Sequence, residues 1–242
     1  MENHGKNYEP MKTENEMVPS NPFEAGQVLL LDKPATWTSF DVVNKIRRTI
    51  RLKKVGHAGT LDPLATGLLI ICTGKMTKQI DTYQAQEKEY TGRIVLGKTT
   101  PSLDLETPFD AAYDISHITP DMIFTAVKAL TGPLQQIPPM YSAIRVDGKR
   151  LYQQVRKGRE IEVQPRPVTV FTFEITDVNL PSVDFRIVCS KGTYIRSLAR
   201  DLGLQLQSGA YLESLRRTRI GDFRIENATT IEAFVQQHRQ PS

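Results

Sequence analysis

The order of strand-like and helix-like runs along the chain is the feature that most constrains its fold. Alternating or continuously apolar runs, which are typical of strands, occupy 27–37, 67–74, 88–97, 168–180, 183–195 and 213–225. Runs with apolar residues every three or four positions, which are typical of helices, occupy 38–56, 75–86, 119–132, 195–206 and 229–238. Because the order is mixed and strands do not strictly alternate with helices, the sequence predicts an α+β domain. Its central sheet should be mixed, mostly antiparallel, and flanked by helices and loops.

Local signals fix the start of two of these helices. Thr38 with Asp41 three residues later forms a capping-box pattern, and Thr119 followed by Pro120 is typical of a helix N-terminus. The segment 136–158 begins as a Pro-rich loop, and we expect it to end as a short helix.

The N-terminal segment differs in composition from the rest of the 242 residues. Residues 1–25 are polar and carry five glutamates against two lysines, so we expect a disordered tail, and the remaining residues 26–242 are more basic than the total charge of +4. Cys72 and Cys189 lie in apolar runs, which favours core thiols in a reducing compartment over a disulfide or a zinc site. No run is long enough to span a membrane and no signal segment is visible, so a soluble cytoplasmic protein is expected.

The loop GHAGTLDPLATG (56–67) presents one carboxylate, Asp62, among small residues. Three glycines and two alanines leave room for another molecule to approach, and Pro63 stiffens the chain after the acid. Asp before Pro is also ordinary turn chemistry, so a turn-capping role stays open. One carboxylate does not suit glycoside hydrolysis, which usually takes two.

A run of basic residues precedes this loop in the sequence. Six basic residues with no acid between them lead into it: Lys45, Arg47, Arg48, Arg51, Lys53 and Lys54. They favour a phosphate-binding rim, although a solvated helix face gives the same pattern. Arg196 in KGTYIRSLAR could form a bidentate pair that keeps a buried Asp62 ionised, but spacing cannot establish the pair, and the residues alone favour a surface helix position.

The chain closely resembles the bacterial tRNA pseudouridine-55 synthase family, tRNA pseudouridine synthase B. The motifs that carry the resemblance run in family order from about residue 27 to the end: LDKPATWTSFDVV, VGHAGTLDPLATGLLIICTGKMTK, KEYTGRIVLG, QIPPMYSAIRVDGKRLYQ, CSKGTYIRSLARDLG and ESLRRTRIGDF. It implies the pseudouridine synthase fold and an isomerase that converts uridine 55 of the tRNA T loop to pseudouridine.

The resemblance also implies roles for single residues. Asp62 would be the catalytic carboxylate, Arg196 its ion-pair partner, and Tyr90 would stack on the target base near the proton that leaves C5. The implied substrate-binding and supporting residues are His57 against the flipped RNA loop, Lys33 of the LDKP motif, and Tyr194 and Leu215 in the uridine pocket. For Leu215 and the aromatic residues, ordinary core packing is a competing interpretation.

The implied reaction breaks the bond between uracil N1 and ribose C1′, turns the base and rejoins it through C5, so no atom is added. No redox cofactor, nucleotide or metal is expected, and the sequence contains no phosphate loop or dinucleotide fingerprint. Asp62 could attack C1′ or remove a ribose proton. A uridine inside a folded RNA loop must flip out to reach Asp62, so the expected partner is the tRNA T stem-loop, bound by a monomer without an obligate protein partner.

The sequence departs from the family pattern in two places. Many members continue into a C-terminal RNA-binding module of the PUA type, which we expect to be absent here, with a shorter RNA footprint. In GKTTPSLDLETP, Asp104 matches the family acid, while Ser102 replaces the usual Thr and Thr107 the usual Gly. These changes put the shape of that loop in question.

Three other functions compete with the isomerase. An RNA-folding chaperone acting on the T arm would not need Asp62. A guide-RNA-dependent synthase would need protein partners and the C-terminal module. A base-flipping methyltransferase would need a methyl-donor site, and no Gly-rich nucleotide loop follows a strand.

Overall fold

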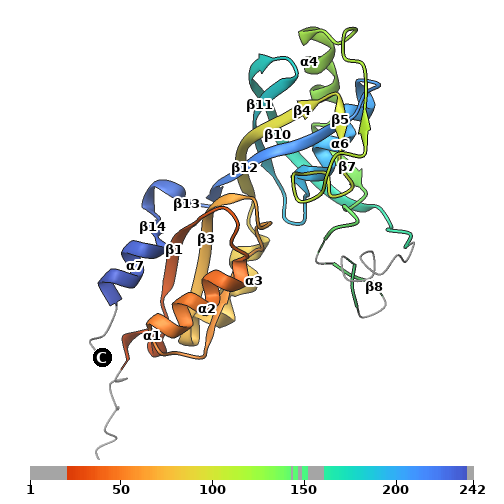
Figure 1. Ribbon diagram of the computed structural model, residues 1–242. Coiled ribbons are helices and arrows are strands. Elements are labelled where there is room, and N and C mark those ends of the chain that lie inside the picture. The colour runs from red at the N-terminus through yellow and green to blue at the C-terminus, as the bar shows by residue number, and fades with distance from the viewer. Residues whose placement is uncertain (1–20, 143, 147–148, 152–160, 239–242) are drawn as a thin grey trace, which may run out of the picture.

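The computed structural model describes residues 21–142, 144–146, 149–151 and 161–238 (Figure 1). One large sheet runs through the molecule in the order β14-β1-β3-β12-β4-β11-β10-β7, with β2 paired to β3 and β13 to β12. Its strands are β1 (Val28–Lys33), β2 (Val55–His57), β3 (Thr66–Thr73), β4 (Lys88–Leu96), β7 (Gly132–Gln136), β10 (Arg166–Asn179), β11 (Ser182–Cys189), β12 (Ala210–Ile220), β13 (Phe223–Arg224) and β14 (Thr229–Thr230). Two small hairpins lie outside it, β5 (Lys98–Thr99) with β6 (Ala111–Ala112) and β8 (Arg145–Val146) with β9 (Lys149–Arg150).

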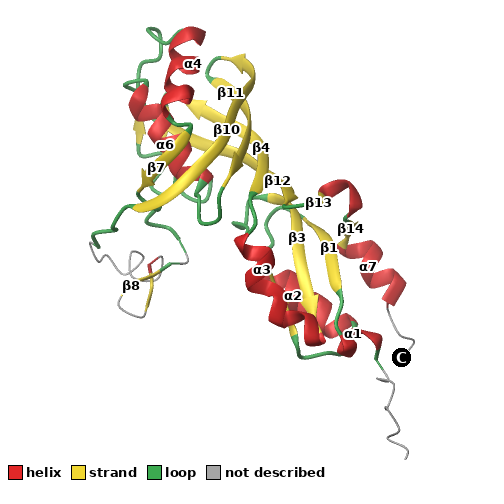
Figure 2. Cartoon of the chain, turned by 180° about the vertical axis from the view of Figure 1, so that it is seen from behind, coloured by secondary structure: helices red, strands yellow, loops and turns green. Residues whose placement is uncertain are grey.

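The sheet is mixed but mostly antiparallel. Within the described residues, the β1–β14 and β12–β3 pairs are parallel and the other strand pairs are antiparallel. Helices and loops flank this sheet (Figure 2). The predicted α+β architecture is therefore confirmed.

The sequence of strand β3 is an uninterrupted apolar run because both faces of the strand are covered. Leu69 and Ile71 point to one face, where they pack with α1 (Pro22–Ala25), α2 (Ser39–Thr49) and α7 (Ile231–His238). Leu68, Ile70 and Cys72 point to the other face, toward the 3-10 helix η1 (Gly74–Gln79), α3 (Ile80–Ala85) and β13. Because successive side chains of a strand alternate between faces, a strand covered on both sides carries apolar residues at every position.

The other half of the sheet is covered on one face only. Helices α4 (Pro120–Ala129) and α6 (Ile195–Gln205) contribute to the largest apolar core, together with β4, β10, β11 and β12. Cross-strand ion pairs join the polar side chains of these strands, such as Arg93 to Asp184 at 2.6 Å and Arg186 to Glu174 at 2.8 Å. Strand β12 runs from this half into the other, as Figures 1 and 2 show from opposite sides.

The local helix signals give the expected geometry. Thr38 and Asp41 form the capping box, and the Thr119 hydroxyl accepts a hydrogen bond from the backbone N–H of Met122 with Pro120 in the first turn. The run 75–86 differs from the single helix that we predict, because it is a 3-10 helix followed by a short α-helix.

The described chain begins within the segment that we expect to be a tail. Residues 1–20 lie outside the described residues, but Pro22–Ala25 is a short helix whose Phe23 is buried against Phe234. The folded part therefore starts before the expected boundary at residue 26, because Phe23 packs on Phe234 and the segment forms hydrogen bonds with Ile50 and Thr73. The short helix expected at the end of 136–158 falls largely outside the described residues.

None of the described helices combines the length and apolar character that crossing a membrane requires.

Candidate active site

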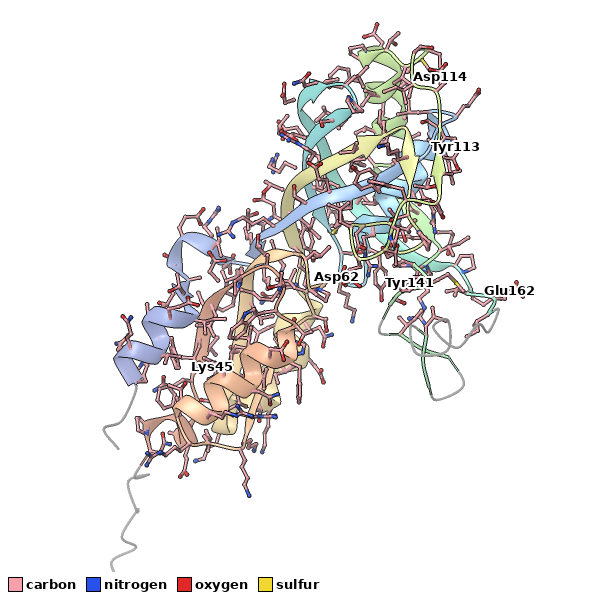
Figure 3. The ribbon with its side chains drawn as sticks, viewed as in Figure 1. Lys45, Asp62, Tyr113, Asp114, Tyr141 and Glu162 are labelled. Carbon is pink, nitrogen blue, oxygen red and sulfur yellow. The ribbon has the colours of Figure 1, made fainter. Side chains whose placement is uncertain are left out.

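A cavity of about 600 Å³ opens where the two halves of the sheet meet. The loop after β2, the strands β4 and β12, and the start of α6 form its walls. Four residues predicted for the site line it: Asp62, Tyr90, Tyr194 and Leu215. Figure 3 shows Asp62 at this junction of the two halves.

Asp62 is held by Arg196. The Arg196 Nη2 donates a hydrogen bond to Asp62 Oδ1 at 3.1 Å, and Nε lies 2.9 Å from Oδ2 as an ion-pair contact without hydrogen-bond alignment. The Arg196 side chain is 3% exposed and that of Asp62 is 34% exposed, so the arginine lies behind the carboxylate and the carboxylate faces the cavity. A buried guanidinium in this position orients the Asp62 carboxylate. The pairing that sequence spacing could not establish is present.

Arg196 also ties two other segments to the site, the loop of Ser102 and Asp104 and the segment that contains Tyr141. Its Nη1 donates to the Ser102 carbonyl at 2.9 Å and its Nη2 to the Tyr141 carbonyl at 3.0 Å. The buried Asp104 carboxylate lies 3.6 Å from Nη1, so two acids share one arginine.

The two unusual residues of this loop, Ser102 and Thr107, contact each other. The Thr107 hydroxyl lies 2.8 Å from the Ser102 hydroxyl and accepts a hydrogen bond from the Ser102 backbone N–H at 3.1 Å. The loop that presents the Ser102 carbonyl to Arg196 is thereby closed by the two unusual side chains. Their departure from the usual residues leaves the contact with Arg196 in place.

Lys33 does not line the cavity but supports the backbone of the Asp62 loop. It is fully buried, and its Nζ donates to the carbonyls of Pro34, Trp37 and Pro63 at 2.9, 2.6 and 3.1 Å. Since Pro63 follows Asp62, this ammonium fixes the backbone next to the carboxylate. Burial lowers the pKa of Lys33 from 10.5 to about 8, although the negative charge of Asp62 partly opposes the shift.

Tyr90 and Tyr194 frame the cavity from different elements. Tyr90 is buried on β4, and burial raises the pKa of its phenol, while the charge of Arg217 acts in the opposite direction. Tyr194 is the N-cap residue of α6, where the Gln136 side-chain amide accepts from its N–H at 2.8 Å and donates to its carbonyl at 3.1 Å. That amide clamp sets the start of the helix that carries Arg196.

His57 lies outside the cavity lining. It ends β2, its Nδ1 is buried and has no hydrogen-bond partner among the described residues. Burial lowers the pKa of His57, and the charge of Arg217 lowers it further, so the ring is neutral at neutral pH. The structure therefore does not bring His57 together with Asp62 in the way that it does Tyr90 and Arg196.

The basic run before the loop starts at some distance from the cavity. Lys45 lies on α2, away from Asp62 (Figure 3), while Ser39 at the start of that helix bonds to Leu61 beside Asp62. Arg47 donates to the Val55 carbonyl at 2.7 Å and so has a structural partner. The other five basic side chains of the run are exposed.

Two buried cations in the cavity wall were missed by the sequence analysis. Arg217 on β12 is 1% exposed, and Lys88 on β4 is 5% exposed. Burial lowers the pKa of Lys88 to about 8, and Arg217 adds to the shift. Arg217 is part of the motif ESLRRTRIGDF, but nothing in the motif tells which of its arginines faces inward. Among the residues that the structure describes, no cluster of three His, Cys, Asp or Glu side chains has the arrangement of a metal site.

Two family models together match most of the chain. The model described as TruB family pseudouridylate synthase (N terminal domain) matches residues 47–195, and that described as tRNA pseudouridylate synthase B C-terminal domain matches residues 196–240. A protein of Flavobacterium johnsoniae named tRNA pseudouridine synthase B is 52% identical over 90% of this chain and 98% of that protein. A protein of the same name from Phocaeicola vulgatus is 52% identical over 88% of this chain and 93% of its own.

Solved structures show the same architecture. A chain in the structure titled "Crystal Structure of a Cbf5-Nop10-Gar1 Complex" superposes with a TM-score of 0.69 at 31% identity, over 88% of this chain and 54% of that chain. A chain in "Structure of H/ACA RNP bound to a substrate RNA containing 2'-deoxyuridine" gives a TM-score of 0.66 at 29% identity. This chain thus spans about half the length of those structural neighbours.

Proposed function

Because the chain belongs to the TruB family of pseudouridylate synthases, we propose that it isomerises uridine 55 in the T loop of tRNA to pseudouridine, with Asp62 as the catalytic carboxylate. The chain is a pseudouridine synthase, and its relatives carry the name tRNA pseudouridine synthase B. The observation that carries the proposal for Asp62 is its pairing with the buried Arg196 at the mouth of a cavity lined by Tyr90 and Leu215.

The cavity suits one flipped nucleotide. Its volume of about 600 Å³ lies within the usual range of small-molecule sites, and Tyr90, Tyr194 and Leu215 give it apolar surface against which a uracil ring can lie. Lys88 and Lys191 add positive charge to the cavity lining, which favours the polyanionic backbone that accompanies the base.

The reaction needs side chains for two functions: action on the ribose and removal of the C5 proton. The N1–C1′ bond breaks and a C5–C1′ bond forms, while one proton leaves C5 and N1 gains one, so atoms balance without a co-reactant. Asp62 is oriented to act on the ribose, either by attack on C1′ or by removal of a ribose proton, and Arg196 holds the carboxylate in place for both routes. Tyr90, which also lines the cavity, is the candidate to receive the C5 proton in its phenolate form.

Tritium release from a T-arm stem-loop labelled at C5 of uridine 55 tests this function. We expect the purified protein, without added cofactor, to release the label and Asp62→Asn to release none while still binding the RNA. Asp114→Asn is the matched control, because Asp114 is an exposed loop acid far from Asp62 (Figure 3) and should leave release unchanged.

Two outcomes would contradict the proposal. Release by Asp62→Asn at the parental rate would remove Asp62 from the chemistry. Binding of the stem-loop by the parent without any release would exclude this substrate and favour a folding chaperone that acts on the T arm.

We further propose that the chain acts in the cytoplasm as a monomer without an obligate protein partner. The titles of the structural neighbours name complexes with Nop10 and Gar1, so the contrast is testable. Activity and sedimentation of the purified chain alone, with and without tRNA, would check it.

A further inference from the structure

Arg217 is the largest fully buried side chain of the described residues, and it lies in the cavity wall. Within the described part of the chain, three of its hydrogen bonds go to backbone carbonyls, another links it to the Tyr90 phenol, and it has no carboxylate partner. Nε donates to Leu68 at 2.7 Å, Nη2 to Gly59 at 3.1 Å and Nη1 to Thr60 at 3.4 Å. A buried guanidinium without an acid is costly, so its retention calls for a role.

The three acceptors show what Arg217 holds. Gly59 and Thr60 lie before Asp62 in the loop that presents it, and Leu68 belongs to β3, which follows that loop. Gly59 has a φ of +93°, and a side chain there would meet Arg217 Nη1 at 3.6 Å. One planar guanidinium therefore spans the two ends of the loop that presents the carboxylate.

The strand register brings the same arginine to Tyr90. In the β12–β4 pair, Arg217 lies directly opposite Tyr90, and directly opposed residues of antiparallel strands project to the same face. Arg217 acts to lower the pKa values of several groups near it, among them Lys33, His57, Lys88 and Tyr90. It is thus a source of positive potential shared by all of them.

We propose that Arg217 is a positioning residue for the isomerisation: it clamps the Asp62 loop through the carbonyls of Gly59, Thr60 and Leu68 and sets a positive charge beside Tyr90. This inference rests on the proposed function, in which Asp62 and Tyr90 act on the uridine. The clamp makes the distance from Asp62 to the ribose reproducible, and the charge favours the phenolate form of Tyr90, which is the form that can take the proton from C5. A lysine can supply the charge but not the fork that reaches three carbonyls.

The test compares Arg217→Gln and Arg217→Lys with the parent in single-turnover tritium release and in T-arm binding. Arg216→Gln is the matched control, because Arg216 is the next residue on β12 but pairs with Asp32 through a side chain that is 41% exposed. We expect both Arg217 variants to bind the RNA within a few fold of the parent and to lose about 100-fold or more in rate, as a displaced reacting group does. Arg216→Gln should keep the parental rate.

A second readout needs no substrate, and it separates the charge from the clamp. The Tyr90 phenol is titrated in the free protein as the ultraviolet difference between each variant and its Tyr90→Phe counterpart. Asp62 and Cys189 are the other charged or titratable groups that act on Tyr90, and the variants leave both in place. We expect Arg217→Gln to raise the pKa of the Tyr90 phenol and Arg217→Lys to keep it close to the parental value.

The outcomes are separable from failure of the proposed function, because an inactive parent would contradict the proposed function while the Tyr90 titration still decides the charge. If Arg217→Lys releases tritium at the parental rate, the proposed clamp on the Asp62 loop is contradicted. If the pKa of the Tyr90 phenol in Arg217→Gln equals the parental value, the proposed effect of the Arg217 charge on Tyr90 is contradicted. If Arg217→Gln does not fold, Arg217→Lys decides: parental affinity with a lost rate supports the clamp, and a parental rate overturns it.

Discussion

Lys33 makes the stability of this protein depend on pH in a direction that can be calculated. The pKa of this buried lysine is about 8 in the folded protein, against an ordinary value of 10.5. Between these two values the unfolded chain binds the proton and the folded chain does not, so the free energy of unfolding rises with pH. At about 1.4 kcal/mol per pH unit, the difference between the two pKa values adds about 3 kcal/mol to the free energy of unfolding. This increase is complete above pH 10.5.

The contribution of Lys33 is isolated by subtracting the free energy of unfolding of Lys33→Met from that of the parent at each pH. Cys72 and Cys189 act the other way over the same range, because burial raises the pKa of each thiol, but they titrate equally in both proteins and cancel. Urea unfolding of both proteins at a series of pH values measures the difference. At neutral pH the variant also leaves the carbonyls of Pro34, Trp37 and Pro63 without their donor, so the slope and not the offset is predicted. We expect the free energy of unfolding of the parent minus that of Lys33→Met to rise from pH 8 to 10.5. If this difference stays flat or falls, the hydrogen bonds of the ammonium outweigh its burial, and the reasoning is refuted.

Two further predictions concern packing. Gly67→Ala should destabilise the protein by about 2 kcal/mol or more in denaturant unfolding, since Gly67 has a φ of +103° and a Cβ there would lie 2.3 Å from the Arg217 carbonyl oxygen. Gly132→Ala, with a φ of +104° and open space around it, isolates the backbone strain, and an equal loss in both variants would disprove the steric part. Cys72 and Cys189, with pKa values of about 11 and about 12, should resist alkylation in the native protein at pH about 8 and react on unfolding. Mass spectrometry reads this out, and modification of either thiol before unfolding would show that it is not buried.

The elements of the fold could be predicted where the signal is local. The Thr38–Asp41 capping box, the Thr119–Pro120 helix start and the apolar run of β3 each depend on a few neighbouring residues, and the structure contains all three. The docking of Phe23 against α7 could not be predicted, because it depends on a contact across the whole length of the chain.

The site was predictable to the extent that the family motifs name it. Asp62, Tyr90, Tyr194 and Leu215 line one cavity and Arg196 pairs with Asp62, as the resemblance implies. His57 carries an equally specific motif position, yet it lies outside the cavity lining. A motif fixes which residues recur and in what order, while the walls of the cavity are set by how the elements pack.

Arg217 shows most clearly what a sequence leaves open. The run Arg216-Arg217-Thr218-Arg219 places three cations in four residues, and on a strand a shift of one residue exchanges the two faces. Arg216 reaches Asp32 and Arg219 reaches Glu87, both partly exposed acids, while Arg217 turns into the cavity. The pairing of Arg217 with Tyr90 and the irregularity between Arg217 and Arg219 decide this, and both depend on β4, more than 120 residues earlier in the chain. The same register that makes Arg217 the buried cation also places it beside the phenol and behind the Asp62 loop, so its burial and its proposed role have one cause.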